Sequence, residues 1–272
     1  MMTSNNWNCA DMVEPESVET ESELKNSIPR VWGPWATVGF GLAIIVVGLF
    51  VQVVITIVFI VAGFFTETEP GLNGLIFFDW LETINLGLLI SLSVIISSVV
   101  CIALVIVFIK ARRGDTVAGY LGLKAISAKA ALVSLVVLVG FIAIQVLVNI
   151  VFEVPAESDI MVDAYASSVW PALFWIAVIV VGPVFEEVLF RGFLFEGLRY
   201  SRIGVIGAVI VTSLVWAVSH LQYGLFQIAW IFVFGVILGI MRYSTGSLWA
   251  PTIMHVSNNL IAVLFIALEV GV

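Results

Sequence analysis

Residues 35–65 read WATVGFGLAIIVVGLFVQVVITIVFIVAGFF, without a single Asp, Glu, Lys or Arg. An α-helix needs about 20 apolar residues to cross the hydrocarbon core of a membrane, and this run exceeds that length. Six further apolar runs follow, at 86–109, 130–152, 170–190, 203–219, 225–241 and 249–270. They must be helical, because the hydrocarbon core has no water to satisfy unbonded backbone groups. The sequence therefore predicts an all-α, polytopic integral membrane bundle of seven transmembrane helices, or eight if the stretch 72–84 adds a short one.

The composition supports this class. Apolar residues make up 61% of the 272 residues and charged residues only 11%, whereas a soluble domain carries roughly 25% charged residues. The mean hydropathy is +1.16. The few basic residues are scattered, so nothing favours a nucleic-acid partner. Membrane lipids are the expected surroundings, and the oligomeric state is left open.

Charge also divides the chain into segments. The first 24 residues hold six acids: Asp11, Glu14, Glu16, Glu19, Glu21 and Glu23. With too few apolar residues to fold alone, residues 1–30 are predicted to be an acidic, disordered cytoplasmic tail. Residues 31–272 are predicted to form the transmembrane domain. Cys9 lies in the tail and Cys101 lies inside an apolar run, so we expect no disulfide between them. No Cys-based metal site is indicated either.

The positive-inside rule predicts the orientation. If the N-terminus is cytoplasmic and seven spans alternate, all Lys and Arg residues fall on the cytoplasmic side. These are Lys25, Arg30, Lys110, Arg112, Arg113, Lys124, Lys129, Arg191, Arg199, Arg202 and Arg242. The outer loops then hold only acids. We therefore expect a multi-pass protein of the cell membrane with a cytoplasmic N-terminus.

Ionisable residues inside the spans are costly and are functional candidates for that reason. They occur in three segments: GPVFEEVLFRG (182–192), WAVSH (216–220) and HVSNN (255–259). Glu187 and Arg191 are four residues apart and can form an ion pair on one helix face. Glu186 lies about 100° further round the helix, so it is expected to face a different neighbour.

The three segments can meet at one depth. With a helical hairpin turning near residues 201–203, Glu186 and His220 lie roughly 23 and 27 Å from the turn. His255 lies roughly 12 Å beyond the turn at residues 245–246, so the first hairpin must project into the cytoplasm for all three to meet. The site is then expected to open towards the cytoplasm. Taken singly, each of these residues also fits a helix end at the headgroups or an interhelical hydrogen bond.

Two chemistries use a glutamate and two histidines. Zinc held by Glu186, His220 and His255 could activate water. Alternatively, a carboxylate in an apolar pocket could act directly as a general base. The HExxH pattern of common zinc peptidases is absent. We expect no cofactor, with zinc at this cluster not excluded.

These residues also resemble the three signature motifs of the CAAX-processing and bacteriocin-processing membrane endopeptidase family, EExxxR, FxxxH and HxxxN. The resemblance covers residues 168–268, with Trp216 standing where Phe is usual. It implies a helical intramembrane glutamic peptidase, similar to type II CAAX prenyl endopeptidases. Glu186 and His220 would activate water, His255 and Asn259 would stabilise the oxyanion, and Glu187, Arg191 and Trp216 would support the site.

The resemblance further implies hydrolysis of a peptide bond near the C-terminus of a membrane-associated or lipidated protein or peptide. Whether prenylated proteins, bacteriocins or others are cleaved is left open. Two alternatives remain at this point. One is a non-catalytic immunity or scaffold member of the same family. The other is a proton-coupled transporter, against which the confinement of the polar residues to the last four spans argues.

Overall fold

The computed structural model describes residues 31–66, 85–114, 116–154 and 159–271. The predicted acidic tail (residues 1–30) and the stretch 72–84, where an eighth helix was left open, lie outside these residues. The described part contains only helices: α2 (Pro34–Thr66), α4 (Leu86–Ala111), α5 (Val117–Leu121), α6 (Ala128–Phe152), α7 (Asp159–Ala166), α8 (Pro171–Trp175), η1 (Ile176–Val181), α9 (Gly182–Glu187), η2 (Val188–Leu194), α10 (Phe195–Leu198), α11 (Gly204–Val218), α12 (Leu225–Thr245) and α13 (Trp249–Val270).

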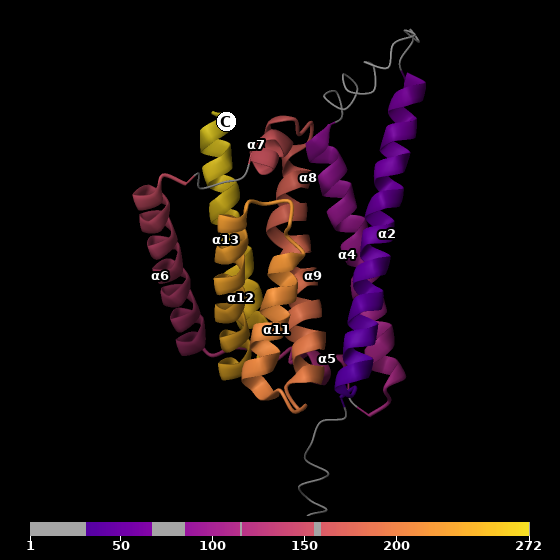
Figure 1. Ribbon diagram of the computed structural model, residues 1–272, viewed down its shortest axis with the longest axis vertical. Helices are drawn as coiled ribbons and strands as arrows, with labels where there is room; N and C mark the ends of the chain where they lie inside the picture. The colour runs from indigo at the N-terminus through magenta and orange to yellow at the C-terminus, as the bar shows by residue number, and fades with distance from the viewer. Residues whose placement is uncertain (1–30, 67–84, 115, 155–158, 272) are drawn as a thin grey trace, which may run out of the picture. The chain divides into compact units, whose positions relative to one another are not determined.

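The predicted all-α membrane bundle is confirmed (Figure 1). In the described residues, six helical segments are long and apolar enough to cross a membrane, and α11 is a shorter apolar helix of 15 residues. Each of the seven predicted spans corresponds to one of these seven segments. At 1.5 Å per residue, α11 is about 22 Å long, less than the hydrocarbon core of about 30 Å.

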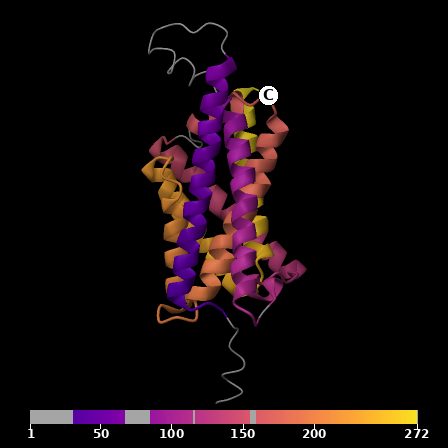
Figure 2. The same ribbon diagram turned by 90° about the vertical axis from the view of Figure 1, so that its right-hand side faces the viewer.

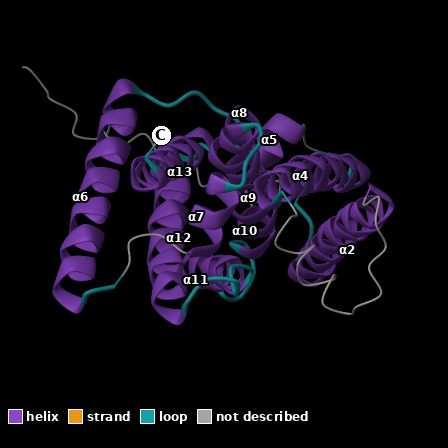
Figure 3. Ribbon diagram, turned by 90° about the horizontal axis from the view of Figure 1, so that it is seen from above, coloured by secondary structure: helices purple, strands orange, loops and turns teal. Residues whose placement is uncertain are grey.

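The outer helices expose apolar surface. On α6, Leu132, Val136, Leu147 and Ile150 are among the exposed side chains. Seen from above, α6 stands at one edge of the bundle and α2 at the other (Figure 3). A surface of this kind is stable only against lipid, because in water it would leave large contiguous apolar patches exposed.

The fourth segment is one continuous helical rod from Pro171 to Leu198, and half of its most apolar window is buried. It packs against α4, α11 and α13, so it lies among the other helices. Two stretches, η1 and η2, are π-helical. Such stretches often occur at functional sites, because they break the regular backbone ladder and redirect side chains. The candidate glutamates lie in α9, between the two.

The described basic residues other than Arg191 gather at one end of the bundle, which we call the basic end. Its members are Lys110, Arg112, Arg113, Lys124, Lys129, Arg199, Arg202 and Arg242. This end is the lower one in Figure 1, where α5 and the α10–α11 turn lie. Figure 2 shows the same helices from the side, with α2 and α4 running alongside one another.

Buried hydrogen bonds close the basic end. Arg242 Nη2 lies 3.3 Å from Glu196 Oε2 and donates to the Leu121 carbonyl oxygen at 3.4 Å. Glu196 also pairs with Arg199 at 2.7 Å. Burial, followed by the nearby Glu196 carboxylate, raises the pKa of Tyr200, so its phenol stays protonated and can donate to Glu196 at 3.4 Å. These contacts tie together α5, α10 and α12.

Candidate active site

Glu187 and Arg191 form the buried ion pair that their spacing predicts. Arg191 Nη1 lies 3.0 Å from Glu187 Oε1, and both side chains are fully buried. A buried charge is tolerated when its partner and further hydrogen bonds compensate for lost water. Arg191 Nη2 donates to the Gly235 carbonyl oxygen at 3.0 Å, and its guanidinium lies 4.5 Å from the centre of the Trp216 ring. The pair therefore links η2 to α11 and α12.

Gly235 on α12 lets the side chains of Arg191 and Trp216 lie close to the α12 backbone. A Cβ at Gly235 would lie 3.1 Å from Arg191 Nη2 and 3.0 Å from the Trp216 ring. At Gly239, one turn further on, a Cβ would lie 2.9 Å from Val209 on α11. Both glycines therefore lie where α11 and α12 pack closely together. At Gly235 the packing also serves the site.

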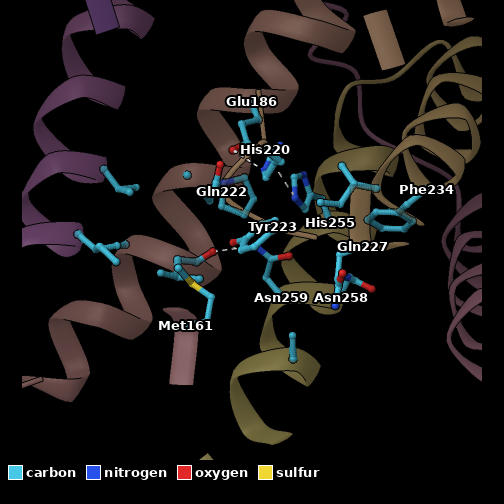
Figure 4. A pocket seen from close by; sticks show the side chains of 18 of the residues that line it. Met161, Glu186, His220, Gln222, Tyr223, Gln227, Phe234, His255, Asn258 and Asn259 are labelled. Atoms are coloured by element: carbon cyan, nitrogen blue, oxygen red, sulfur yellow. Dashed lines mark hydrogen bonds and ion pairs between the residues drawn. The ribbon is translucent and has the colours of Figure 1, made fainter. Parts of the chain in front are cut away.

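Glu186 faces the other way, into a cavity, and its side chain is 24% exposed. The Trp216 indole N–H donates to Glu186 Oε2 at 2.6 Å. His220 Nε2 lies 3.9 Å from Glu186 Oε1, and His255 Nε2 lies 3.8 Å from Glu186 Oε2. Figure 4 shows the three side chains converging. The structure therefore brings together the glutamate and both histidines from three separate segments.

The second nitrogen of each histidine is held by an acceptor. His255 Nδ1 lies 3.0 Å from Glu187 Oε1, and His220 Nδ1 lies 2.8 Å from the Trp216 carbonyl oxygen. A carboxylate and a carbonyl oxygen only accept hydrogen bonds, so both Nδ1 atoms carry the proton. The hydrogen bonds at Nδ1 fix the orientation of both rings and turn both Nε2 atoms towards Glu186. A hydrogen bond at one imidazole nitrogen generally determines the protonation of the other.

Asn259 lines the same cavity, but its hydrogen bond serves the backbone. Its Nδ2 donates to the Val178 carbonyl oxygen at 2.9 Å. In η1 the Gly182 N–H bonds to the Ala177 carbonyl, and Pro183, the next residue, has no N–H to offer Val178. Asn259 supplies the missing donor. The predicted role at the oxyanion is not tested by this contact.

A cavity of about 590 Å³ extends from this cluster. Its lining includes Glu186, His220, His255 and Asn259, together with polar residues that the sequence reasoning passed over: Gln52, Thr56, Ser93, Ser97, Gln145, Asn149, Gln222, Gln227 and Asn258. That reasoning started from the ionisable residues and the motifs that contain them. Amides one helical turn apart inside apolar runs, such as Gln145 and Asn149, are the signal that could have found them.

The cavity extends away from the basic end. It reaches Met161 on α7 and Phe265 near the C-terminal end of α13. The helix α7 and that end of α13 lie at the upper end in Figure 1. Between the cluster and the basic end lie fully buried Arg191, Phe193 and Leu238. The cavity lining therefore lies on the side away from the basic end, whereas the sequence led us to expect a site that opens on the side of the basic residues. The direction in which the site opens stays a prediction. Which end faces the cytoplasm stays a prediction.

A metal was left open at this cluster. In the described part of the chain, no group of three His, Cys, Asp or Glu side chains is arranged to hold a metal ion. Zinc needs ligand atoms about 2.0–2.3 Å away from it. Here the two histidines face different oxygens of Glu186, and Trp216 already occupies Oε2. Whether the cluster needs a metal stays a prediction.

The comparisons with known proteins agree with the three motifs. Residues 168–261 match the family model described as type II CAAX prenyl endopeptidase Rce1-like. An uncharacterized 24.3 kDa protein of Escherichia coli is 32% identical over 116 residues, which are 41% of this chain and 52% of that protein. The chain thus spans about half the length of this curated relative. No solved structure matches.

The described part of the chain is therefore a multi-helix membrane bundle in which residues 168–261 are similar to the type II CAAX prenyl endopeptidase Rce1-like family. The resemblance predicted from the motifs is confirmed for residues 168–261, which contain Glu186, Glu187, Arg191, Trp216, His220, His255 and Asn259.

Proposed function

We propose that this protein is an intramembrane endopeptidase in which Glu186, with His220, activates water for attack on a peptide bond. One observation carries the proposal. Among the described residues that line the cavity, Glu186 is the only Asp, Glu, Lys or Arg, and both histidines turn Nε2 towards it within 3.9 Å. A carboxylate and an imidazole at this separation suit proton transfer from a shared water molecule.

The geometry leaves a place for that water. A water at about 2.8 Å from both Glu186 Oε1 and His220 Nε2 would sit at the apex of a triangle whose base is 3.9 Å. His220 Nε2, unprotonated in the neutral ring, accepts one hydrogen bond from the water. Glu186 accepts the other and takes that proton as the oxygen attacks the carbonyl carbon.

The tetrahedral intermediate then collapses. Protonated Glu186 gives its proton to the leaving nitrogen and the C–N bond breaks. The second water proton leaves the new carboxyl group through His220 Nε2 and reaches the amine, so the products are a carboxylate and an ammonium group. The developing oxyanion needs donors. His255, in its doubly protonated form, and the second N–H of Asn259 are the candidates on this cavity wall.

The supporting residues hold this arrangement. The Trp216 N–H keeps Glu186 Oε2 in place, so Oε1 is the oxygen offered to the water. Glu187 orients His255, and Arg191 compensates the Glu187 charge. We propose that the reaction needs no metal and that activity survives a zinc chelator.

The proposed substrate is a membrane-associated or lipidated protein or peptide, cut near its C-terminus. The segment that matches the prenyl endopeptidase model supports this choice.

Purified protein in liposomes, given prenylated and leader-bearing peptides, tests the proposal by mass spectrometry. Cleavage should be lost in Glu186→Gln and retained in the control Glu269→Gln, which changes an exposed carboxylate on α13. Unimpaired cleavage by Glu186→Gln would contradict it. If the cellular role persists in a Glu186→Ala, His220→Ala double variant, a scaffold or immunity role is favoured. Substrate uptake that Glu186→Gln abolishes would favour a transporter.

A further inference from the structure

The cavity has a second group of polar residues away from the catalytic cluster. On α6, Gln145 and Asn149 are one turn apart and both line it. Across the cavity, Gln52 on α2 and Ser97 on α4 line it as well. We call the three amide residues Gln52, Gln145 and Asn149 the amide group. Polar side chains at such depth in apolar helices are costly, and cost of this kind points to function.

Internal hydrogen bonds do not account for the amide group. Gln52 Nε2 reaches Ser97 Oγ only at 3.4 Å, the long limit of a hydrogen bond. Asn149 Oδ1 is buried without a hydrogen-bond partner in the described residues. A buried amide oxygen without a partner is destabilising. A ligand that donates a hydrogen bond to Asn149 Oδ1 would explain why this unpaired oxygen is there.

The chemistry of the group selects the ligand. Amide side chains both donate and accept hydrogen bonds, as a peptide main chain does. A hydrocarbon chain would leave the amides unpaired. An anionic ligand would lack a compensating charge, since no Lys or Arg of the described residues lines the cavity, and a cationic one would pair with Glu186 instead of the amides. A charged substrate residue bound by the amides alone would pay a desolvation cost without a partner. An uncharged, extended polypeptide segment satisfies the site best.

We propose that the amide group is a substrate subsite that binds the main chain of an uncharged, extended segment next to the scissile bond. The inference rests on the proposed peptidase function and names what its cavity selects. The subsite lies in the half of α6 remote from the basic end, so the bound segment occupies that half of the membrane. Recognition of the main chain would make the enzyme tolerant of neutral side chains and intolerant of charged ones.

Steady-state cleavage of a neutral peptide by the wild type and by Asn149→Leu and Gln145→Leu tests the subsite. We expect KM to rise about tenfold in each variant with kcat unchanged, the effect of losing about one hydrogen bond. Ile150→Leu, an exposed neighbour on α6, is the matched control and should match the wild type. A Lys in the segment should prevent cleavage.

Backbone N-methylation of the peptide separates main-chain recognition from shape. It should weaken binding to the wild type about tenfold at one position and have no further effect in Asn149→Leu. Equal loss in both proteins would overturn the proposal. The proposal also fails if Asn149→Leu weakens binding of a lipidated peptide but not of the same peptide without its lipid. The amide group would then bind the lipid chain.

The affinity of peptides for Glu186→Gln measures binding at the subsite without catalysis. If peptides bind this variant and Asn149→Leu weakens the binding, while the wild type cleaves nothing, the peptidase proposal fails and the subsite stands. If the wild type cleaves and Asn149→Leu leaves KM unchanged, the subsite fails and the peptidase stands.

Discussion

Two neighbouring carboxylates differ in environment because consecutive helix residues point about 100° apart. Glu187 faces α12 and α13 and is compensated by Arg191 and His255. Glu186 faces the cavity and retains an oxygen that a water molecule can reach. One residue holds the site together, and its neighbour is free to react. Each role predicts a different result on substitution.

The buried ion pair predicts a large effect of Arg191→Met on stability. Removing the arginine leaves Glu187 charged and uncompensated in the interior, which costs about 3–5 kcal/mol. Thermal unfolding in detergent should show a clear drop in the midpoint. Arg202→Gln, at an exposed position of the basic end, serves as the control. An unchanged midpoint for Arg191→Met would mean that the pair is not buried.

The indole of Trp216 predicts an effect on rate. In Trp216→Phe the ring remains but the hydrogen bond to Glu186 Oε2 is lost. Hydrogen bonds to charged groups contribute about 1.5–3 kcal/mol, so kcat should fall about 10- to 100-fold with the fold intact. Steady-state kinetics measure the change in kcat. Trp249→Phe, which changes an exposed tryptophan on α13, is the control. If Trp216→Phe keeps the wild-type kcat, the hydrogen bond does not position the glutamate.

Helix periodicity predicted the ion pair and the separation of Glu186 from Glu187, because both depend on one helix alone. The meeting of Glu186, His220 and His255 followed from counting residues to the turns. The Trp216 hydrogen bond did not follow, since its partner comes from a different helix. The polar cavity lining was missed for a related reason. A single amide leaves a long run apolar on average, and whether it lines a cavity depends on which face the tertiary packing turns inward.

At the scale of elements, the fourth helical segment is shaped by Pro183. Proline removes an N–H from the backbone ladder, and η1 precedes it directly. The unpaired Val178 carbonyl recruits Asn259 from α13. A residue of the third motif thus serves to fasten α13 to the segment that carries Glu186.

This contact predicts that Asn259→Leu destabilises the protein. The Val178 carbonyl would lose its donor inside the bundle, at a cost of about 1–3 kcal/mol. The unfolding midpoint should fall together with activity. Asn258→Leu, a neighbouring residue that also lines the cavity, tests whether the effect is specific. A variant that loses activity at an unchanged midpoint would assign Asn259 to chemistry alone.

Apolar runs predicted most helix boundaries within a few residues, and the largest difference is informative. The fourth segment continues to Leu198, eight residues beyond its predicted end. Its last turns contain Arg191 and Glu196, which end a hydropathy run. Glu187 on α9 pairs with Arg191, and Arg242 on α12 pairs with Glu196, so both charges are hidden inside the bundle. A hydropathy pattern cannot distinguish a buried, paired charge from one at the membrane surface.

At the scale of the whole molecule, charge and cavity lie at opposite ends. The described basic residues other than Arg191 mark one end, and the cavity extends towards the other. If the positive-inside rule holds here, the cavity faces the non-cytoplasmic half of the membrane. The substrate would then approach from the outer half. The sequence could not reveal this, because it requires knowing which ends of the helices the cavity joins.

Cysteine labelling tests the orientation. In a background with Cys9→Ser and Cys101→Ser, a membrane-impermeant maleimide added to intact cells should label Gln222→Cys, at an exposed residue beside the cavity. Arg202→Cys, on the basic end, should react only after the cells are permeabilised. The reverse pattern would place the basic end outside and the cavity on the cytoplasmic side.

Cleavage in ¹⁸O-labelled water tests the central claim most directly, that Glu186 activates water against a peptide bond. Wild-type protein in liposomes should release a product whose new carboxylate carries one ¹⁸O atom, detected by mass spectrometry. Glu186→Gln should release none, while its fold and its peptide binding persist. A labelled product formed by Glu186→Gln at the wild-type rate would contradict the account.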